Sequence, residues 1–236
     1  MHPWKILCDF DGTVSIPDAT DALLEQYARP EWKDLERQWH EGAIGSRDCM
    51  SRQVGLIEAS EREIDRVCDG IPIDPAFPQF VEHARRLGLE LVIVSDGLDR
   101  IIHRILANNR LDGLTVIANH LVQAGPRNWE MQSPHANHAC VVKSGTCKCA
   151  CAAHSIAAGN KVLLIGDGQS DVCVAARADF VFAKRRLLAH CQDEGIAHQP
   201  FDDFSDVLAM LPDLVQGMFD RNPLPPPSPG HRTEYA

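Results

Sequence analysis

The 236-residue sequence lacks both the long apolar runs of membrane proteins and the basic excess of nucleic-acid-binding proteins. No stretch reaches the ~18 apolar residues of a membrane span, and residues 1–30 show no basic start followed by an apolar core and a cleavage site. With 33 acidic against 23 basic residues, the net charge is -10, which argues against a nucleic-acid or anionic-membrane surface. We therefore expect a cytoplasmic protein that binds neither nucleic acid nor membranes.

Without an export signal, the nine cysteines are expected to be free thiols. The densest group combines four cysteines with three histidines: Cys140, Cys147, Cys149, Cys151, His135, His138 and His154. Thiolate and imidazole could bind zinc, but the spacing is not a pair of C-x-x-C units, and neighbouring odd positions cannot all face one ion without an irregular backbone. Packed or reactive thiols are therefore the preferred interpretation, and zinc is the alternative.

What the sequence does contain is an alternation of short apolar runs and amphipathic stretches. The apolar runs predict strands at residues 6–8, 91–94, 114–118, 162–165 and 180–182. Helical spacing of apolar residues predicts helices at residues 80–87, 98–108, 150–158, 172–177 and 202–219. A hairpin is expected from residues 119–122 and 129–131. This alternation indicates the α/β class, with a Rossmann-like parallel sheet as its core.

Residues 16–75 interrupt the alternation with about four short helices, whose starts include Pro17, Ser46 and Ser60. This is too much chain for a simple crossover between two strands. We interpret it as a small helical cap inserted after the first strand; the alternative is that these helices pack flat on the sheet. Residues 1–15 and 76–220 then form the core, and the proline-rich residues 221–236 form a loose tail.

Polar side chains follow three of the predicted strands. They lie in the segments Asp9-Phe10-Asp11-Gly12-Thr13, Ser95-Asp96-Gly97 and Gly166-Asp167-Gly168-Gln169-Ser170-Asp171. Because the carboxyl ends of parallel strands meet at one crevice, we expect these segments to converge. Gly12 lets the chain turn so that Asp9 and Asp11 approach one point, and two such anions need a cation between them. Oxygen ligands favour Mg2+, so a phosphate site with Mg2+ is preferred over simple turn formation.

These motifs resemble those of the haloacid dehalogenase superfamily, whose phosphatases carry D-x-D-x-T, a strand-end Ser or Thr, a Lys and G-D-x-x-x-D in that order. The resemblance covers about residues 5–191. It implies that Asp9 is the nucleophile that forms an aspartyl-phosphate and that Asp11 is the general acid/base. It also implies that Ser95 holds a phosphoryl oxygen and that Asp167 and Asp171 bind or support the metal.

The same chemistry involves further groups. The Thr13 hydroxyl and the amides around Gly97 can donate to phosphate oxygens. A carboxylate that attacks a phosphate dianion also needs a metal on one side and a lysine on the other. We prefer Lys148, because Gly145-Thr146-Cys147-Lys148 resembles the G-x-C-K element of one branch of the superfamily, and Lys143 is the alternative. The expected metal ligands are Asp9, Asp11, Asp167 and Asp171.

That branch is the phosphoserine-phosphatase-like group, which has a helical cap in the same place. Within it, the chain is most similar to the methionine-salvage phosphatases, on residues 51–54, 129–134 and the cysteine-rich approach to Lys148. One departure concerns the cap. Gln53 stands where phosphoserine phosphatases have the arginine that grips the substrate carboxylate, with Arg52 one position earlier.

A second departure is Asp96, which stands where a glycine is usual. Related phosphoethanolamine and phosphocholine phosphatases have an aspartate there, so Asp96 could face a cationic substrate group or could cap the following helix. Asp18 lies where the family often has an acid at the cap hinge, and could contact substrate or cap a helix.

We therefore expect a Mg2+-dependent phosphomonoester hydrolase that acts on a small phosphorylated metabolite through an aspartyl-phosphate. A phosphoserine, phosphoethanolamine or phosphocholine phosphatase is the alternative within the class. A non-catalytic sensor of a phosphate ligand is the alternative outside it. The presence of both Asp9 and Asp11 favours catalysis, because binding alone requires no general acid/base.

Overall fold

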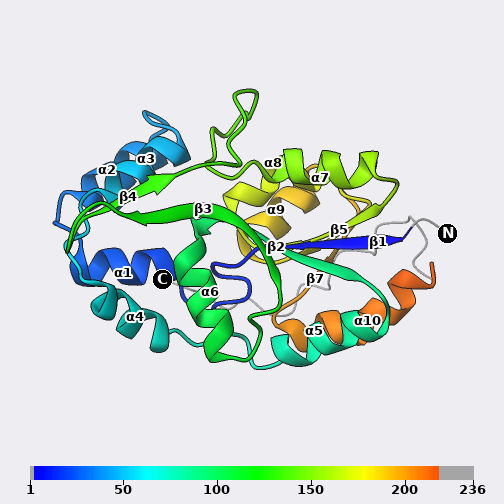
Figure 1. Ribbon diagram of the computed structural model, residues 1–236. Helices are drawn as coiled ribbons and strands as arrows, with labels where there is room; N and C mark the ends of the chain where they lie inside the picture. Colours follow the sequence, from blue (N-terminus) through cyan, green and yellow to red (C-terminus); the bar gives the residue numbers. More distant parts are fainter. Residues whose placement is uncertain (1–2, 218–236) are drawn as a thin grey trace, which may run out of the picture.

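The computed structural model describes residues 3–217, which contain one seven-stranded sheet with helices on both faces (Figure 1). The strand order is β4-β3-β2-β1-β5-β6-β7, and neighbours pair in parallel except β3 and β4, which are antiparallel. The strands are β1 Trp4–Cys8, β2 Glu90–Leu98, β3 Thr115–Gln123, β4 Trp129–Gln132, β5 Lys161–Gly166, β6 Phe180–Ala183 and β7 His198–Pro200. The predicted α/β class is confirmed.

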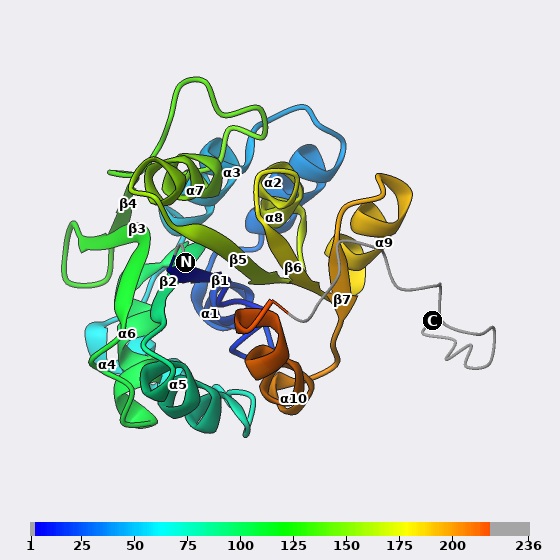
Figure 2. The same ribbon diagram turned by 90° about the vertical axis from the view of Figure 1, so that its right-hand side faces the viewer.

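Helices cover both faces of the sheet because successive strand residues point to opposite sides. The helices that cover these two faces are α5 Phe77–Arg86, α6 Asp99–Asn108, α7 Lys148–Ala157, α8 Gln169–Ala175, α9 Arg185–Asp193 and α10 Phe204–Val215. Ile6 and Cys8 belong to the core shared with α5, α6 and α10, whereas Leu7 packs with α7, α8 and α9 (Figure 2). The strand β1 is therefore buried on both sides, as its continuous apolar run predicts.

The strands β2 and β5 flank β1 and run beside its carboxyl end, where β2 continues beyond it to Leu98. Cys8, the last residue of β1, pairs with Ile93 on one side and with Ile165 on the other. The register between β2 and β3 shifts between Val94 and Leu98, so the regular ladder is interrupted where the polar residues of β2 begin. This arrangement brings three polar chain segments to one edge of the sheet.

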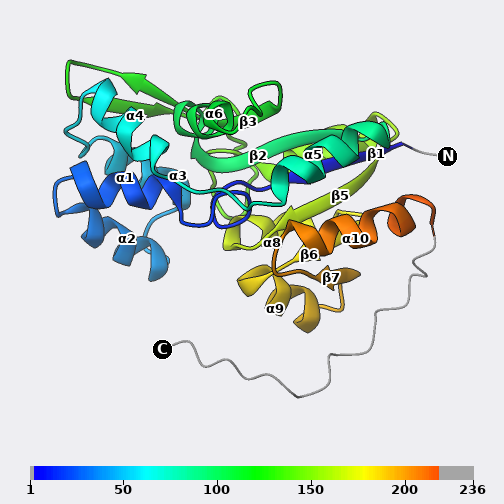
Figure 3. The ribbon, with the colours of Figure 1, turned by 90° about the horizontal axis from the view of Figure 1, so that it is seen from below.

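Four helices separate β1 from α5, as predicted. They are α1 Ala19–Tyr27, α2 Trp32–His40, α3 Ser46–Val54 and α4 Glu61–Asp69. They gather at one end of the molecule, next to the β3–β4 hairpin, rather than spreading over a sheet face (Figures 1 and 3). The indole of Trp129 on β4 donates to the carbonyl of Ala59, and Arg127 pairs with Glu63 of α4. The division of the chain into a core and a cap at residues 16–75 stays a proposal.

Two elements were not predicted from the sequence, α9 and β7, and the single strand expected at 114–118 continues as β3 to Gln123. The helix α9 begins after Lys184, whose side chain makes no capping hydrogen bond, so the usual start signal is missing. The tail predicted at residues 221–236 lies outside the described residues. No helix within residues 3–217 is both long enough and apolar enough to cross a bilayer.

Candidate active site

The residues that follow β1 form the centre of the site. Asp9 continues the sheet by donating its amide to the carbonyl of Ile165, and its side chain is buried. Gly12 then turns the chain with φ +71°, in the left-handed region that favours glycine. A Cβ at Gly12 would also lie only 2.6 Å from an Asp167 carboxylate oxygen. The turn therefore needs glycine both for its conformation and for the close approach of Asp167.

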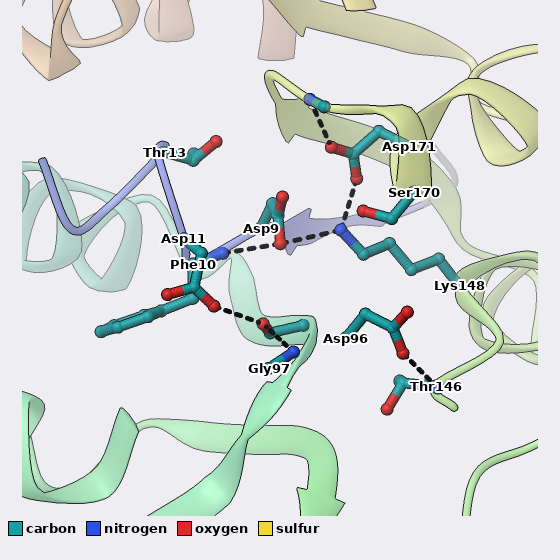
Figure 4. Close-up of polar contacts among 12 residues, drawn as sticks. Asp9, Phe10, Asp11, Thr13, Asp96, Gly97, Thr146, Lys148, Ser170 and Asp171 are labelled. Atoms are coloured by element: carbon teal, nitrogen blue, oxygen red, sulfur yellow. Dashed lines mark hydrogen bonds and ion pairs between the residues drawn. The ribbon is translucent and has the colours of Figure 1, made fainter. Parts of the chain in front are cut away.

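Lys148 lies between two carboxylates beneath the site (Figure 4). Its Nζ is 2.8 Å from Asp9 Oδ1 and 2.6 Å from Asp171 Oδ1, and all three side chains are buried. Burial lowers the pKa of Lys148, but the carboxylates of Asp171 and Asp9 outweigh it and raise that pKa above its ordinary value. Lys143, the alternative, is exposed and packs beside Gly45. The structure brings Lys148 to Asp9 and leaves Lys143 outside.

Asp9, Asp167 and Asp171 form a group that fits a divalent cation. One carboxylate oxygen from each lies within 4.8 Å of the others, and all three residues are buried. Burial raises the pKa of Asp9 and of Asp167, and the charge of Asp171 raises both further. Such repulsion is what a bound cation relieves, and a donor set of oxygen alone suits Mg2+.

Asp11, which was expected among these ligands, lies outside the group. One of its oxygens accepts from the amide of Ala19 at 2.9 Å, and the other accepts from the Ser95 hydroxyl at 3.3 Å. The Ala19 amide is the first of helix α1, so the helix N-terminus points at this carboxylate. Burial raises the pKa of Asp11 well above its ordinary value, and the nearby Asp18 adds to the effect. A carboxyl group with these properties suits proton transfer better than metal binding.

The expected phosphate-binding groups are close to Asp9 and Asp11, and each already has a partner; those of Lys148 and Ser95 are given above. The Gly97 amide donates to Ser95 Oγ at 2.9 Å, and the Thr13 hydroxyl donates to Asp167 Oδ1 at 3.2 Å. Ser95 and Gly97 line the cavity described below, whereas Thr13 is buried and does not line it. In this arrangement Thr13 orients Asp167.

Asp96 neither caps the next helix nor has free carboxylate oxygens. Its Oδ1 accepts from the amides of Gly145 and Thr146 at 2.8 and 2.9 Å, and its Oδ2 accepts from Ser46 Oγ at 2.6 Å. The helix α6 begins after Leu98, with no side-chain cap. Asp96 therefore joins the segment that leads to Lys148 to the start of α3.

Above these groups lies a cavity of about 270 Å3. It is lined by Asp9, Asp11, Gly12, Asp18, Thr20, Trp39, Ser46, Met50, Ser95, Asp96, Gly97, Asp167, Gly168, Gln169, Ser170 and Arg185. From α3 it receives Ser46 and Met50, one helical turn apart. Asp18 also caps α1 by accepting from the amide of Asp21, so both of its expected roles are compatible with its place.

Two expected substrate residues on α3 are not in the cavity. The side chain of Arg52 is 50% exposed and pairs with Asp48 on its own helix. Gln53 is buried, and its Nε2 donates to Glu36 of α2 at 2.8 Å. The sequence indicated the correct helix but not the face that it presents to the site. Met50, Trp39 and Arg185 were missed, and only Arg185 lies on an element that the sequence did not predict.

The cysteine and histidine cluster does not assemble a metal site. Within residues 3–217, the only set of three or more potential ligands that could hold one ion is the aspartate group. Cys149 instead lies against Cys173 of α8, with 3.0 Å between their sulfur atoms. This favours the interpretation of packed thiols over the zinc alternative.

The comparisons with known proteins agree with this geometry. Residues 6–176 match the model of the haloacid dehalogenase-like hydrolases. The chain belongs to this family. It is 29% identical over 209 residues to the 2-hydroxy-3-keto-5-methylthiopentenyl-1-phosphate phosphatase of an Exiguobacterium species, with 87% of this chain and 96% of that protein covered. It is 30% identical over 205 residues to the Bacillus velezensis enzyme of that name, with 86% and 87% covered.

Solved structures show the same fold at lower identity. A phospho-aspartyl intermediate analogue of phosphoserine phosphatase superposes with a TM-score of 0.67 at 18% identity, over 89% of this chain and 99% of that one. A probable phosphoserine phosphatase from Vibrio cholerae gives a TM-score of 0.69 at 18% identity, over 93% and 68%. The family and its curated relatives identify the chain as a phosphatase.

Proposed function

We propose that the chain is a Mg2+-dependent phosphomonoesterase whose substrate is a small phosphate ester with an uncharged, partly apolar leaving group. The 2-hydroxy-3-keto-5-methylthiopentenyl-1-phosphate named for its relatives fits this description. The observation that carries the proposal is the composition of the cavity wall. Met50 and Trp39 line it, while Arg52 points away.

The chemistry follows from the buried groups. Asp9 attacks phosphorus, the bond from phosphorus to the ester oxygen breaks, and Asp11 gives its proton to the leaving alkoxide. Water then attacks the phosphoryl group on Asp9 and Asp11 takes a proton from this water. The bond from phosphorus to the Asp9 oxygen breaks, which restores the Asp9 carboxylate and releases inorganic phosphate. Lys148 screens the repulsion between Asp9 and the phosphate dianion. Mg2+, held by Asp9, Asp167 and Asp171, would supply further charge neutralisation when bound.

The selectivity argument rests on charge. An amino-acid phosphate carries a carboxylate, which needs a bidentate partner to compensate for its desolvation. The cap provides none, because Arg52 is engaged with Asp48 and Gln53 with Glu36. Asp96 is a weak partner for a cationic substrate, because its oxygens already accept hydrogen bonds from two amides and a hydroxyl. An uncharged leaving group has neither difficulty.

A substrate panel tests this proposal. We expect kcat/KM for the methylthiopentenyl phosphate to exceed that for phosphoserine and for phosphoethanolamine by at least about tenfold, or ~1.4 kcal/mol. Phosphoserine as the best substrate would overturn the selectivity argument.

The metal is tested separately. Activity should disappear with EDTA and return with Mg2+ but not with Zn2+ alone, because the proposed ligands are all oxygen. Full activity after exhaustive chelation would overturn Mg2+ dependence. A cytoplasmic location and action on a small molecule rather than on nucleic acid stay predictions.

A further inference from the structure

Arg185 is an additional cation at the site, and no motif in the sequence marks it. Its Nη1 donates to Asp167 Oδ2 at 2.9 Å and lies 3.4 Å from the carbonyl oxygen of Gly12. The two partners differ in exposure, with 59% of the Arg185 side chain exposed and 11% of the Asp167 side chain. The guanidinium therefore reaches from solvent onto one of the candidate metal ligands.

The backbone fixes Arg185 in this place. It is the first residue of α9 and has φ 50°, in the left-handed region that is costly for residues other than glycine. The segment around it is bound to the end of β5, because the Lys184 amide donates to the Gly166 carbonyl and the Leu187 amide to the Asp167 carbonyl. These bonds hold the root of Arg185 beside Asp167.

The charge around the cavity makes this one side chain important. Among the residues 3–217 that line the cavity, five carry a carboxylate, and Arg185 alone carries a basic group. Lys148 lies below, buried between Asp9 and Asp171. A phosphorylated substrate that enters the cavity therefore finds its cationic partner among the described lining residues in Arg185.

We propose that the Arg185 guanidinium stays hydrogen-bonded to the Asp167 carboxylate until Mg2+ binds there, and that the displaced guanidinium then binds the substrate phosphate. The proposal rests on the function proposed above. A metal ion lies about 2 Å from its oxygen ligands, so Mg2+ on Asp167 would repel a guanidinium hydrogen-bonded to the same carboxylate. The phosphate dianion offers Arg185 a bidentate partner in exchange. Metal binding and phosphate binding are thereby coupled through one residue.

The coupling predicts that Arg185→Gln changes two affinities in opposite directions, that for Mg2+ and that for phosphate. Calorimetric titration with Mg2+ alone should show affinity about threefold tighter than wild type, because the metal no longer displaces a partly exposed ion pair. Titration of inorganic phosphate into Mg2+-saturated protein should show affinity about tenfold weaker, because a charged hydrogen-bond partner is lost. For the best substrate of the panel, KM should rise by a similar factor, with kcat changed less.

Arg186→Gln is the matched control. It removes the same charge at the next position, but Arg186 lines a neighbouring hollow, which shares Trp39 with the active-site cavity, and is not among the described residues that line the cavity itself. We expect wild-type affinities for both Mg2+ and phosphate. Tighter Mg2+ binding in Arg186→Gln, equal to that of Arg185→Gln, would overturn the specific role and indicate an effect of net charge.

Other results of the same titrations would overturn one half of the inference or the other. Arg185→Gln protein with unchanged or weaker Mg2+ binding would overturn the competition for Asp167, and unchanged phosphate affinity would overturn the second contact. Both results concern the inference alone, provided that wild type binds Mg2+ and hydrolyses the panel. Wild-type protein that binds no Mg2+ would overturn the proposed metal dependence and this inference together.

Discussion

The floor and the wall of the cavity are built on different principles. The floor consists of buried charges beside the strand ends, such as Lys148 at the start of α7 and Asp171 in α8, whose side chains are 2% and 0% exposed. The wall consists of partly exposed helix residues, such as Met50 and Trp39. Charges on the floor have no water to replace a lost partner, so each depends on the others. Side chains of the wall can be exchanged one at a time.

This contrast separates chemistry from selectivity. Changes to the floor should lower turnover by orders of magnitude for every substrate. Changes to the wall should alter the ratio between substrates and leave the reaction in place. Asp96 lies between the two, since it bonds both to the segment before Lys148 and to Ser46 of α3.

The largest effect is expected from Asp9→Asn, which keeps the shape of the floor but removes the nucleophile. Phosphate release should fall by about a thousandfold or more. The fold should persist, because Asn can still accept from Lys148 and no longer repels Asp171. Steady-state kinetics and thermal unfolding measure the two properties. Retention of a tenth of wild-type turnover would show that Asp9 is not the nucleophile.

Lys148→Met should be next, with a loss of about a hundredfold or more in kcat. It also leaves Asp9 and Asp171 buried without their counter-ion, which should cost about 3–5 kcal/mol of stability. Lys143→Met is the matched control and should change neither property, because Lys143 is exposed away from the aspartates. Equal losses in the two variants would contradict the assignment of Lys148.

The raised pKa of Asp11 predicts that the stability of the metal-free protein depends on pH. Burial and Asp18 raise the pKa of Asp11 above the ordinary 3.8, so the folded protein binds this proton more tightly than the unfolded chain does. Metal-free stability should therefore decrease as pH rises from about 4 through the folded pKa. Asp11→Asn should flatten that decrease and lower kcat by about a hundredfold. Urea unfolding in EDTA at several pH values measures the slope, and an unchanged slope would rule out Asp11 as its source.

Asp96→Ala should have an intermediate effect, about tenfold in kcat, because the Gly145 and Thr146 amides lose their acceptor and the approach to Lys148 loosens. Ser46→Ala removes only the bond to α3 and should cost less than about threefold. Kinetics on the two variants would separate support of Lys148 from support of the wall. A larger effect from Ser46→Ala would reverse this assignment.

Sequence reasoning was most successful where local pattern and chemistry coincide. The motifs directly follow predicted strands, and the carboxyl ends of parallel strands lie at one edge of the sheet. The proximity of Asp9, Ser95 and Asp167 could therefore be predicted from the parallel topology alone. The face of a helix is different, because it depends on partners distant in sequence. Gln53 points to Glu36 of α2 rather than into the cavity, and no local signal at α3 encodes that bond.

Arg185 was missed for a related reason. Its helix begins after Lys184 with no capping side chain, and its own left-handed backbone is held by bonds to the end of β5. Tertiary contacts, rather than helix propensity, place this residue at the site.

The smallest predicted effect tests the wall directly, by comparison of two residues of α3. Met50 lines the cavity, and Met50→Ala should raise KM for the methylthiopentenyl phosphate by about threefold to tenfold through lost apolar contact. Phosphoserine has no comparable apolar tail, so its KM should change by less than about twofold. Arg52→Ala should leave both values within about twofold, because its side chain is half exposed and its guanidinium pairs with Asp48 on its own helix. If Arg52→Ala instead impaired phosphoserine turnover selectively, α3 would have to rotate toward the cavity in the complex, and the wall would include the arginine face of this helix.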